Sequence, residues 1–396
     1  MKIAFVGGFG FRPKGTIQGR AFPLAEELVR RGHEVTILVT PYDNLKESDK
    51  EWVEEGVRIK GLKVNASRIS YPGLLIRLFH ALDQYNPDIV HIFKPKGFAA
   101  AAGLYLRMKG MRNIVLDCDD WEGWGGWNDI LSYPWVVKEY IDRHERWMMR
   151  STPAVTVASR SLLDRVHEVR KDRAGVYYVP NCGTSAGGLK AHDAARSRRQ
   201  DEVRKEFGLP EGLVIFYNGH FEPGDDIMLF CRTATPVAER NNASIVFVGD
   251  GPDLPKVKDF YASQPAVKVL FFPRLPYDQF VSMIWASDIT AFPYPDNPVH
   301  RSKCSLRVID YMAMGKPVIT SAVGQNKEYI VDGESGILAA AEDEAGFAQK
   351  LEMLLRSPEL RERLGRSAER RIREHFSWGG TPLQQCLAAY SQVVQQ

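Results

Sequence analysis

The chain has 396 residues, of which 44% are hydrophobic and 26% charged, and its net charge is +3. This composition indicates a soluble globular protein with room for two domains, and the net charge is too small to indicate nucleic-acid binding. No apolar run is long enough to cross a bilayer, and the five cysteines are scattered without metal-ligand spacing, which predicts reduced thiols in a cytoplasmic protein whose membrane contact, if any, is peripheral.

The first strand is expected at residues 2–6, and the glycine-rich turn GGFGFRPKGT follows it. This apolar run is short and broken by glycine, which favours a strand over a signal peptide. An amphipathic helix over residues 18–31 and a strand over residues 31–39 would complete a βαβ unit of the doubly wound type. Glycines in such a turn let backbone amides approach a ligand at the carboxyl edge of the sheet, although a plain tight turn explains them equally well.

Strands and helices continue to alternate as far as residue 337, and three helices follow. In the first half the expected strands are PDIVHIF, NIVLD, PAVTVAS and VYYVPN, with an alanine-rich helix after Gly97. Residues 184–204 lack apolar periodicity and are expected to form an interdomain linker with an exposed turn. The second half is predicted to contain the strands LVIFYN, ASIVFVGDGP, VKVLFF and DITAFP, and helices from Ile227 and over residues 277–286, 342–356, 358–375 and 382–394. The last helix presents Leu383, Leu387, Tyr390 and Val394 on one face.

Four acidic residues crowd the end of the strand NIVLD, namely Asp117, Asp119, Asp120 and Glu122. Clustered oxygen ligands suit a hard cation, so a metal site is one interpretation. A second is a carboxylate that holds an acceptor hydroxyl or takes its proton, because crowding by like charges would raise its pKa. Helix capping or simple solvation is a third.

Tryptophan is concentrated just after this cluster, beside Arg143, Arg146 and Arg150. Five of the eight tryptophans lie here: Trp121, Trp124, Trp127, Trp135 and Trp147. Aromatic rings flanked by cations suit a membrane interface or stacking against a sugar ring. A core helix with arginines on its solvent side explains the pattern equally well.

The stretch PVHRSKCSLRVIDYMAMGKPVITS, residues 298–321, is the most informative. Ser305 is a suitable N-cap for a short apolar helix, Gly315 ends that helix, and a β-branched strand follows. The amides of Ser305, Leu306 and Arg307 would point out of the first turn, where the helix dipole favours a phosphate. Arg307 adds a guanidinium fork and Lys303 a point charge. Asp310, one turn further, would accept hydrogen bonds from a sugar hydroxyl beside that phosphate, so the stretch predicts a nucleotide-sugar site.

At these residues SLRVIDYMAMGKPVITSAVGQNKEYIVDGESGIL resembles the retaining family-four glycosyltransferases, also called glycosyl transferases group one, of the GT-B fold. The fragments PDIVH, VTVASRSL, VYYVPNCG and VGDGP are similar to that family too. The resemblance implies an α/β protein with two doubly wound Rossmann-like domains facing across a cleft. The acceptor-side domain would comprise residues 1–183 and 380–396, with the last helix crossing back, and the nucleotide-sugar domain residues 184–379.

The resemblance implies transfer of a hexosyl group from a sugar nucleotide of the UDP or GDP type to a hydroxyl on a glycan or lipid-linked acceptor. Transfer would retain the anomeric configuration and need no metal or other cofactor. The candidate donor-binding residues are Gly15, Gly219, His220, Arg274, Ser302, Lys303, Ser305, Leu306, Arg307 and Asp310. The acceptor-side candidates are Thr16, Asp119, Asp120 and Trp121, and the catalytic candidates are Asp119 and Asp310.

The chain departs from the family pattern at several positions. The family usually has two glutamates eight positions apart, where this chain has Ser302 and Asp310. It usually has an arginine and, five residues beyond, a lysine on the leaving diphosphate, where this chain has His220 and Asp225. One lost charge-assisted bond costs about 1.5 to 3 kcal/mol. The missing charge would have to come from neighbouring loops, which carry Arg274, Arg301, Lys303 and Arg307.

Two other functions remain open. A catalytically weakened GT-B subunit, acting as a nucleotide-binding or scaffolding partner, would fit the missing glutamate, arginine and lysine. A nucleotide-dependent oxidoreductase would fit the first glycine-rich turn, but no clear GxGxxG with a later acidic ribose ligand is present.

Overall fold

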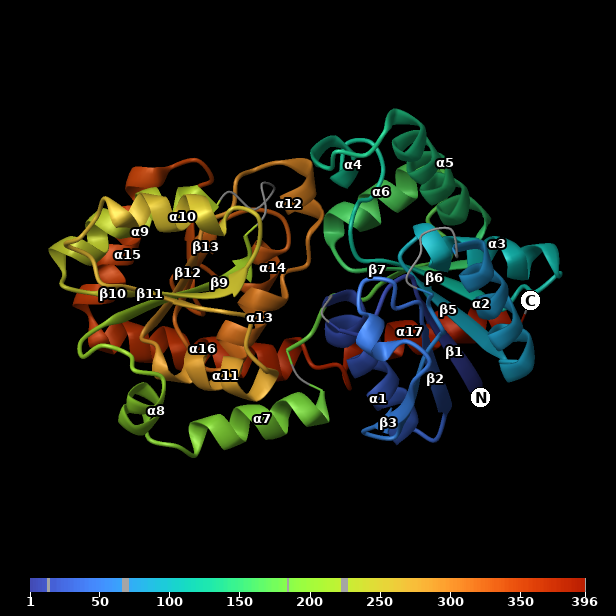
Figure 1. Ribbon diagram of the computed structural model, residues 1–396, viewed down its shortest axis with the longest axis horizontal. Helices are drawn as coiled ribbons and strands as arrows, with labels where there is room; N and C mark the ends of the chain where they lie inside the picture. Colours follow the sequence, from blue (N-terminus) through green and yellow to red (C-terminus); the bar gives the residue numbers. More distant parts are fainter. Residues whose placement is uncertain (13–14, 66–70, 184, 222–226, 396) are drawn as a thin grey trace. The chain divides into compact units, whose positions relative to one another are not determined.

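The computed structural model describes residues 1–12, 15–65, 71–183, 185–221 and 227–395 (Figure 1). It divides into two units, the first made of residues 1–186, 302–304 and 377–396, and the second of residues 187–301 and 305–376. The sequence-based division placed the boundaries at 183/184 and 379/380 and kept residues 302–304 with the second domain. Each unit is built on one sheet. No helix of the described residues is long and apolar enough to span a bilayer.

The first unit is built on an eight-stranded sheet of order β3-β4-β2-β1-β5-β6-β7-β8. β1 lies at the centre and pairs in parallel with β2 and β5, so that Ile3 is level with Val35 and Ile89. Helices cover both faces of the sheet, which is why the central strands are apolar at nearly every position. The strands are β1 (Lys2–Gly7), β2 (Glu34–Val39), β3 (Glu51–Glu54), β4 (Val57–Gly61), β5 (Ile89–Phe93), β6 (Ile114–Cys118), β7 (Ala154–Val157) and β8 (Val176–Tyr178).

An antiparallel hairpin at one edge of this sheet, β3–β4, was not predicted. The two strands are joined by Glu55 and Gly56, whose φ angles are 47° and 82°. Positive φ at both central residues is the signature of the type I′ turn that matches the twist of a hairpin. The sequence signal is weak because β3 has only four residues, none of them buried, and an edge strand does not need an apolar pattern.

Three helices of the first unit were predicted at stated positions, over residues 18–31, after Gly97 and over residues 382–394, and the structure has a helix at each of these places. The predicted helix over residues 18–31 starts earlier, with a π-helical turn η1 (Thr16–Ala21) that runs into α1 (Phe22–Arg30). π-helical turns are rare and often occur at functional sites. The other helices are η2 (Leu45–Glu47), α2 (Tyr71–Tyr85), α3 (Gly97–Met108), α4 (Trp127–Ile130), α5 (Trp135–Ser151), α6 (Arg160–Arg170) and α17 (Thr381–Val394).

The C-terminal helix α17 packs on β6, β7 and β8 and therefore belongs to the first unit. The Tyr390 hydroxyl lies 2.9 Å from Nδ1 of His91 on β5, and both side chains are fully buried. The predicted apolar face is partly wrong. Leu383 and Tyr390 are buried, but Val394 is 50% exposed, and Val393 takes the inward position. The helix is thus rotated relative to the expected face.

The second unit is built on a six-stranded parallel sheet of order β11-β10-β9-β12-β13-β14. Its strands are β9 (Val214–His220), β10 (Ser244–Asp250), β11 (Val269–Phe272), β12 (Ile289–Phe292), β13 (Val318–Ser321) and β14 (Ile337–Ala339). The helices that follow these strands are α9 (Ile227–Arg240), α10 (Leu254–Ala262), α11 (Tyr277–Ala286), α12 (Pro298–Ser302), α13 (Leu306–Ala313), α14 (Asn326–Tyr329), α15 (Glu344–Arg356) and α16 (Pro358–His375). The expected α/β class with two parallel, doubly wound sheets is confirmed.

The prediction of an exposed linker over residues 184–204 is wrong, although Thr184 itself lies outside the described residues. Two helices occupy this stretch, α7 (Ala186–Arg196) and α8 (Gln200–Glu206). Arg196 of α7 donates hydrogen bonds to Glu369 and to the carbonyl of Ala313. His192 is buried and lies 3.0 Å from the Tyr277 hydroxyl. The helices are therefore anchored by polar side chains and small residues, which leave no apolar period in the sequence.

A buried ion pair fixes η1 against the first sheet. Arg20 is 2% exposed, and its Nε and Nη2 donate to both carboxylate oxygens of Asp117 at 2.7 and 2.6 Å. Its Nη1 donates to the carbonyl of Val179 at 2.8 Å and to Oδ1 of Asn181 at 3.0 Å. One guanidinium thus joins η1 to the carboxyl ends of β6 and β8, and the paired Asp117 is unavailable for a ligand.

We predict that Arg20→Met lowers the free energy of unfolding of the first unit by about 3–5 kcal/mol, because the charge of Asp117 stays buried without its partner. Adding Asp117→Asn should recover a large part of that loss. Arg58→Met, which removes an exposed arginine 3.8 Å from Glu51, is the control and should cost less than about 1 kcal/mol. Urea unfolding followed by circular dichroism gives these values. A cost for Arg20→Met as small as that of the control would contradict the assignment.

Candidate active site

Lysines compensate the acidic cluster at the carboxyl ends of β5 and β6. Nζ of Lys94, which follows β5, lies 2.5 Å from Oδ2 of Asp120, 3.0 Å from Oε1 of Glu122 and 3.6 Å from Oδ1 of Asp119. Nζ of Lys96 lies 2.8 Å from Oε2 of Glu122. The carboxylates are thus held by ammonium groups. Within the described residues, no three histidine, cysteine, aspartate or glutamate side chains are arranged to hold a metal ion.

Lys94 is the residue of this cluster that the sequence analysis missed. Its φ is 71°, in the left-handed region that non-glycine residues seldom adopt and that is often found at functional positions. A signal was present, because KPK follows one buried strand and DCDDWE follows the next. The carboxyl ends of neighbouring parallel strands meet at one edge of a sheet, which brings these two segments together.

Two buried carboxyls of the cluster, Asp119 and Glu122, have different pKa values. Burial alone would raise the pKa of Glu122, but Lys94 and Lys96 outweigh it and hold that pKa at about 2. Burial raises the pKa of Asp119 to about 7, against the opposing effect of Lys94. Asp119 accepts a hydrogen bond from the Thr16 hydroxyl at 2.7 Å through Oδ2, while its buried Oδ1 has no hydrogen-bond partner. Separated pKa values in one cluster are typical of acid and base assignments in active sites.

The acceptor-side candidate Trp121 lies in a packed setting, and the donor-binding candidate Gly15 lies at a helix start. A Cβ on Gly125 would lie 2.6 Å from the Trp121 ring, so the glycine makes room for the indole. The guanidinium of Arg165 lies 4.5 Å from the centre of the same ring. Gly15 is the N-cap of η1 with φ −63°, an angle open to any residue. The structure therefore brings Thr16, Asp119 and Asp120 together and places Trp121 against other partners.

In the second unit the side chain of Arg307 lies over the carboxyl ends of β9 and β12. Its guanidinium is 5.1 Å from the ring centre of Phe292 and 5.7 Å from that of Tyr217, whose hydroxyl accepts a hydrogen bond from Nη1 at 3.4 Å. A Cβ on Gly219 would lie 3.1 Å from that nitrogen. Glycine at 219 thus lets the guanidinium approach the backbone where β9 ends.

α13 begins at Leu306 with Ser305 at the N-cap position, as the sequence predicts, and Gly315 follows its end with φ 68°. The Ser305 side chain makes no capping hydrogen bond, so the expected side-chain cap is not formed. Ser305 is nearly buried and Leu306 is half-buried. The helix starts at the expected residue because the apolar face of α13, not the cap, fixes its place in the core.

Asp310 already has a protein partner. Its Oδ1 accepts a hydrogen bond from the Tyr277 hydroxyl at 3.2 Å, and that hydroxyl lies 3.0 Å from Nε2 of His192. Burial raises the pKa of Asp310 to about 7, partly offset by the tyrosine hydrogen bond. Tyr277 and His192 were not predicted, because neither follows from a local motif. One carboxylate oxygen of Asp310 is thus engaged by tyrosine before any sugar hydroxyl arrives.

The remaining donor-side candidates, which are His220, Arg274, Ser302 and Lys303, have other partners or surroundings than Arg307 and Asp310. Nδ1 of His220 lies 3.2 Å from Oδ1 of Asp250, and both side chains are exposed. Arg274 is exposed in the loop between β11 and α11. Ser302 is fully buried, and Ser302 and Lys303 group with the first unit, where the ammonium of Lys303 lies 4.8 Å from the ring centre of Trp127. Asp225, the expected replacement for a family lysine, lies outside the described residues.

Two family models match this chain. The Glycosyltransferase Family 4 model matches residues 20–182, and the Glycosyl transferases group 1 model matches residues 212–357. The chain belongs to the group 1 glycosyltransferases. The N-acetyl-alpha-D-glucosaminyl L-malate synthase of Bacillus anthracis is 24% identical over 89% of this chain and 88% of its own length. The D-inositol 3-phosphate glycosyltransferase of Corynebacterium efficiens is 25% identical over 56% of this chain and 52% of its own length.

Solved structures agree on the fold of this glycosyltransferase. Sucrose-phosphate synthase from Thermosynechococcus elongatus superimposes with a TM-score of 0.74 at 19% identity, covering 98% of this chain and 97% of that one. Anabaena HepE, solved in complex with UDP-glucose, gives a TM-score of 0.74 at 13% identity, covering 99% of this chain and 100% of that one. At identities this low, the structural similarity establishes the fold alone. The expected GT-B architecture of two Rossmann-like domains is confirmed.

We predict that Lys94→Met destabilises the first unit by about 3–5 kcal/mol at neutral pH, because three carboxyls lose their common counter-charge. Removing the ammonium raises the pKa of Asp119 and Glu122, because Lys94 lowers both in the wild type, so protonation stabilises the variant as the pH falls. The loss relative to wild type should therefore be larger at about pH 8 than at about pH 5.5. Chemical unfolding at both pH values measures it.

Lys96→Met is the matched control for this prediction. Glu122 would keep Lys94 as a partner at 3.0 Å, so the control should lose less stability and show a weaker pH dependence. Equal losses at the two pH values for Lys94→Met would show that Lys94 does not govern the protonation of the cluster.

Proposed function

We propose that this glycosyltransferase moves a hexosyl group from a nucleotide diphosphate sugar, of the UDP or GDP type, to a hydroxyl of a glycan or lipid-linked acceptor, with retention of anomeric configuration. The observation that carries the proposal is the guanidinium of Arg307 against the backbone at Gly219. In doubly wound sheets, ligands bind at the carboxyl ends of the strands. The names of the relatives, and the UDP-glucose bound to HepE, support a sugar-nucleotide donor.

In this proposal Arg307 and the first turn of α13 receive the diphosphate. The planar guanidinium matches phosphate oxygens bidentately, and the amides at Ser305 and Leu306 point toward the same anion. As the bond between C1 and the phosphate oxygen breaks, negative charge builds on the leaving diphosphate, which takes the electron pair. Fixed cations and dipoles stabilise that charge. In the proposal neither a metal ion nor another cofactor is required, and Arg307 supplies one positive charge to a site where His220 and Asp225 stand in place of the family's arginine and lysine.

On the acceptor side we assign Asp119 the role of receiving the acceptor hydroxyl. Its buried Oδ1 has no hydrogen-bond partner, and Thr16 holds its other oxygen. As the acceptor oxygen forms its bond to C1, the hydroxyl proton moves to the carboxylate. With the pKa of Asp119 at about 7, the carboxylate is strong enough as a base to take that proton near neutral pH. No residue is assigned a covalent role.

We predict that kcat/KM rises as the pH increases through about 7, because only the deprotonated form of Asp119 accepts a proton. Asp119→Asn should lower kcat by about 100-fold or more and remove this rise. Initial rates of nucleoside diphosphate release between about pH 5.5 and pH 9 test the prediction. Asp120→Asn, which changes the neighbouring carboxylate, is the control and should keep the rise. The base assignment fails if Asp119→Asn keeps the wild-type pH profile.

We predict that Arg307→Ala weakens binding of UDP or GDP by about 10- to 150-fold, because a charge-assisted contact to phosphate contributes about 1.5–3 kcal/mol. Calorimetry with each nucleoside diphosphate measures the affinity, and circular dichroism checks the fold. Arg232→Ala removes an arginine that pairs with Glu344 on the surface and should leave the affinity unchanged. Wild-type affinity in Arg307→Ala would refute the proposed donor site.

A catalytically weakened subunit that binds nucleotides or acts as a scaffold is the second candidate. It is favoured by His220, which pairs with Asp250, and by the buried Ser302 at a position where the family has a carboxylate. Donor sugars of the uridine and guanosine series, tested for product by mass spectrometry, separate the two functions. Nucleotide binding with no transfer from any donor would favour the subunit.

We also propose a cytoplasmic location. All five cysteines are buried and none forms a disulfide, as suits a reducing compartment.

A further inference from the structure

The exposed face of α5 carries aromatic side chains where a surface helix normally carries polar ones. Val136, Tyr140, Arg143, Trp147 and Arg150 follow one another at spacings of four, three, four and three residues, and all five are exposed. Residues spaced in this way lie on one side of a helix. The opposite side of α5 is buried against α3 and α6 and includes Met148 and Met149. The outward stripe is thus a continuous surface, referred to below with Trp135 as the α5 face.

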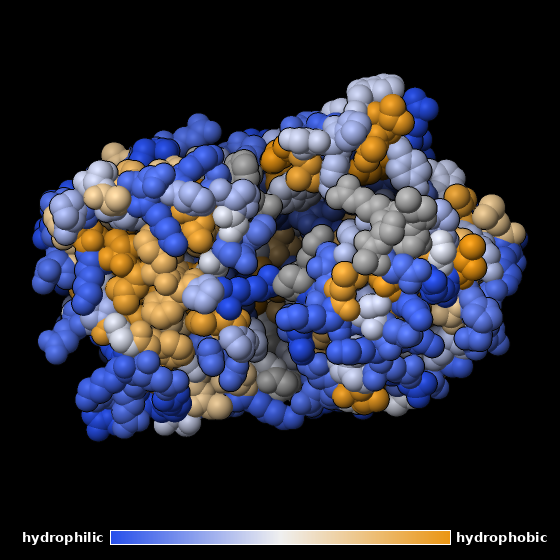
Figure 2. Space-filling model, viewed as in Figure 1, coloured by the Kyte–Doolittle hydropathy of each residue, from blue (hydrophilic) through white to orange (hydrophobic). Residues whose placement is uncertain are grey.

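The apolar part of the α5 face is large and open to solvent. Trp135 is 67% exposed, Val136 71%, Tyr140 52% and Trp147 37%. Figure 2 shows hydrophobic side chains on the surface over α4 and α5. Isolated exposed apolar residues are ordinary, whereas a contiguous group with this much exposure marks an interaction surface.

The charged part of the face is basic. Arg143 is paired with Glu139 at 2.6 Å and Arg146 with Asp142 at 3.0 Å. Arg150 donates to the carbonyl of Val169 at 2.9 Å, and no carboxylate in the described part of the chain pairs with it. Its charge is therefore not neutralised, which gives the end of the face a net positive charge.

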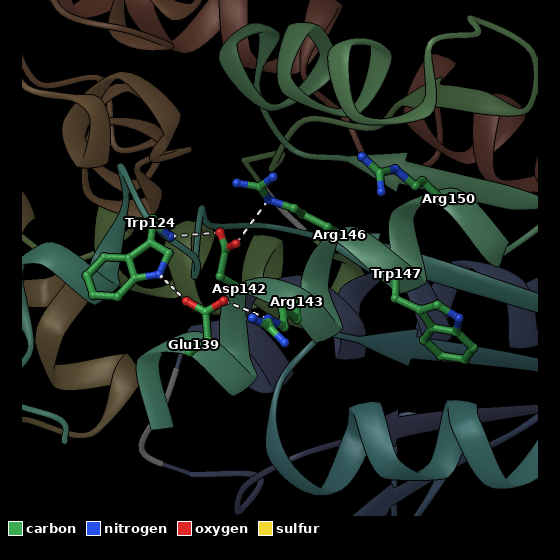
Figure 3. A pocket seen from close by; sticks show the side chains of 7 residues that line it. All are labelled: Trp124, Glu139, Asp142, Arg143, Arg146, Trp147 and Arg150. Atoms are coloured by element: carbon green, nitrogen blue, oxygen red, sulfur yellow. Dashed lines mark hydrogen bonds and ion pairs between the residues drawn. The ribbon is translucent and has the colours of Figure 1, made fainter. Parts of the chain in front are cut away.

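A surface pocket lies beside these arginines (Figure 3). It has a volume of about 440 Å³ and is lined by Trp124, Glu139, Asp142, Arg143, Arg146, Trp147 and Arg150. Trp124 donates its backbone amide to Asp142 at 3.0 Å and its indole N–H to Glu139 at 3.2 Å, so both carboxylates are already engaged. The arginines of this pocket, Arg143, Arg146 and Arg150, would donate hydrogen bonds to an anion that enters it.

We propose that the α5 face docks the protein on an anionic lipid bilayer. Tryptophan and tyrosine are amphipathic and favour the level of the lipid headgroups. Arginines keep their charge at the phosphates while their stems lie along apolar surface, and anionic lipid attracts basic groups. A helix with this arrangement lies in the plane of the interface without spanning it. The inference rests on the proposed function in one respect, since a lipid-linked acceptor would be met at such a surface.

The test is flotation of the full chain with vesicles of phosphatidylcholine alone and with added phosphatidylglycerol. We expect binding only to the anionic vesicles, and weaker binding at high salt because the ions screen the arginines. Arg143→Gln with Arg150→Gln should weaken binding by about 25-fold, at about fivefold for each arginine. Trp135→Ser with Tyr140→Ser should abolish flotation. All four side chains are exposed, and unchanged melting temperatures establish that the variants are folded.

Arg356→Gln with Arg366→Gln on the second unit is the matched charge control and should bind anionic vesicles like the wild type. No flotation of the wild type would overturn the inference, as would wild-type flotation of the α5 variants. A dimer that the α5 variants disrupt, without vesicle binding, would also overturn it and assign the face to a second copy. Calorimetry with nucleoside diphosphates tests the proposed function separately. Absence of vesicle binding would therefore overturn only the lipid inference, and absence of nucleotide binding only the proposed function.

Discussion

Compensation of buried charge at the carboxyl ends of parallel strands is the constraint on which both candidate sites depend. A carboxylate removed from water is costly unless a cation or hydrogen bonds replace the lost solvation. In the first unit Arg20 donates hydrogen bonds to both carboxylate oxygens of Asp117. Lys94 forms ion pairs with three further carboxylates. The compensation is complete for Glu122 and incomplete for Asp119. That inequality makes one carboxyl a structural anchor and leaves the other with a pKa near neutrality.

In the second unit the charge to be compensated is that of the proposed diphosphate, and different residues supply the cation. The family pattern places cations directly after β9, and this chain has His220 there instead, paired with Asp250. Arg307 reaches the same strand end from α13, through the space left by Gly219 and between the rings of Tyr217 and Phe292. Aromatic faces attract a guanidinium and help to hold it in place. A cation held in this way is ordered in advance for a phosphate, so the departure from the family pattern is consistent with a working donor site.

The sequence predicted the elements whose position a local pattern decides. Periodicity and punctuation by glycine and proline gave most strands of both sheets, and α11 and α16 agree with the prediction to the residue. The prediction failed where polar or small residues do the packing. Arg196 and His192 anchor α7 through partners far along the chain, and the short edge strand β3 is joined to β4 by a turn at Glu55 and Gly56. Neither has an apolar period for a sequence reading to detect.

The fold class and the presence of an acidic cluster at the end of β6 could be predicted from the sequence, because both depend on residues that are neighbours in the chain. Only the tertiary structure decided the partners. Lys94 and Asp119 are brought together because β5 and β6 are adjacent and parallel, and Tyr277 reaches Asp310 from another helix. The pKa of each carboxyl follows from those partners and from its burial. Burial and through-space charge are properties of the packed chain, and no local motif encodes them.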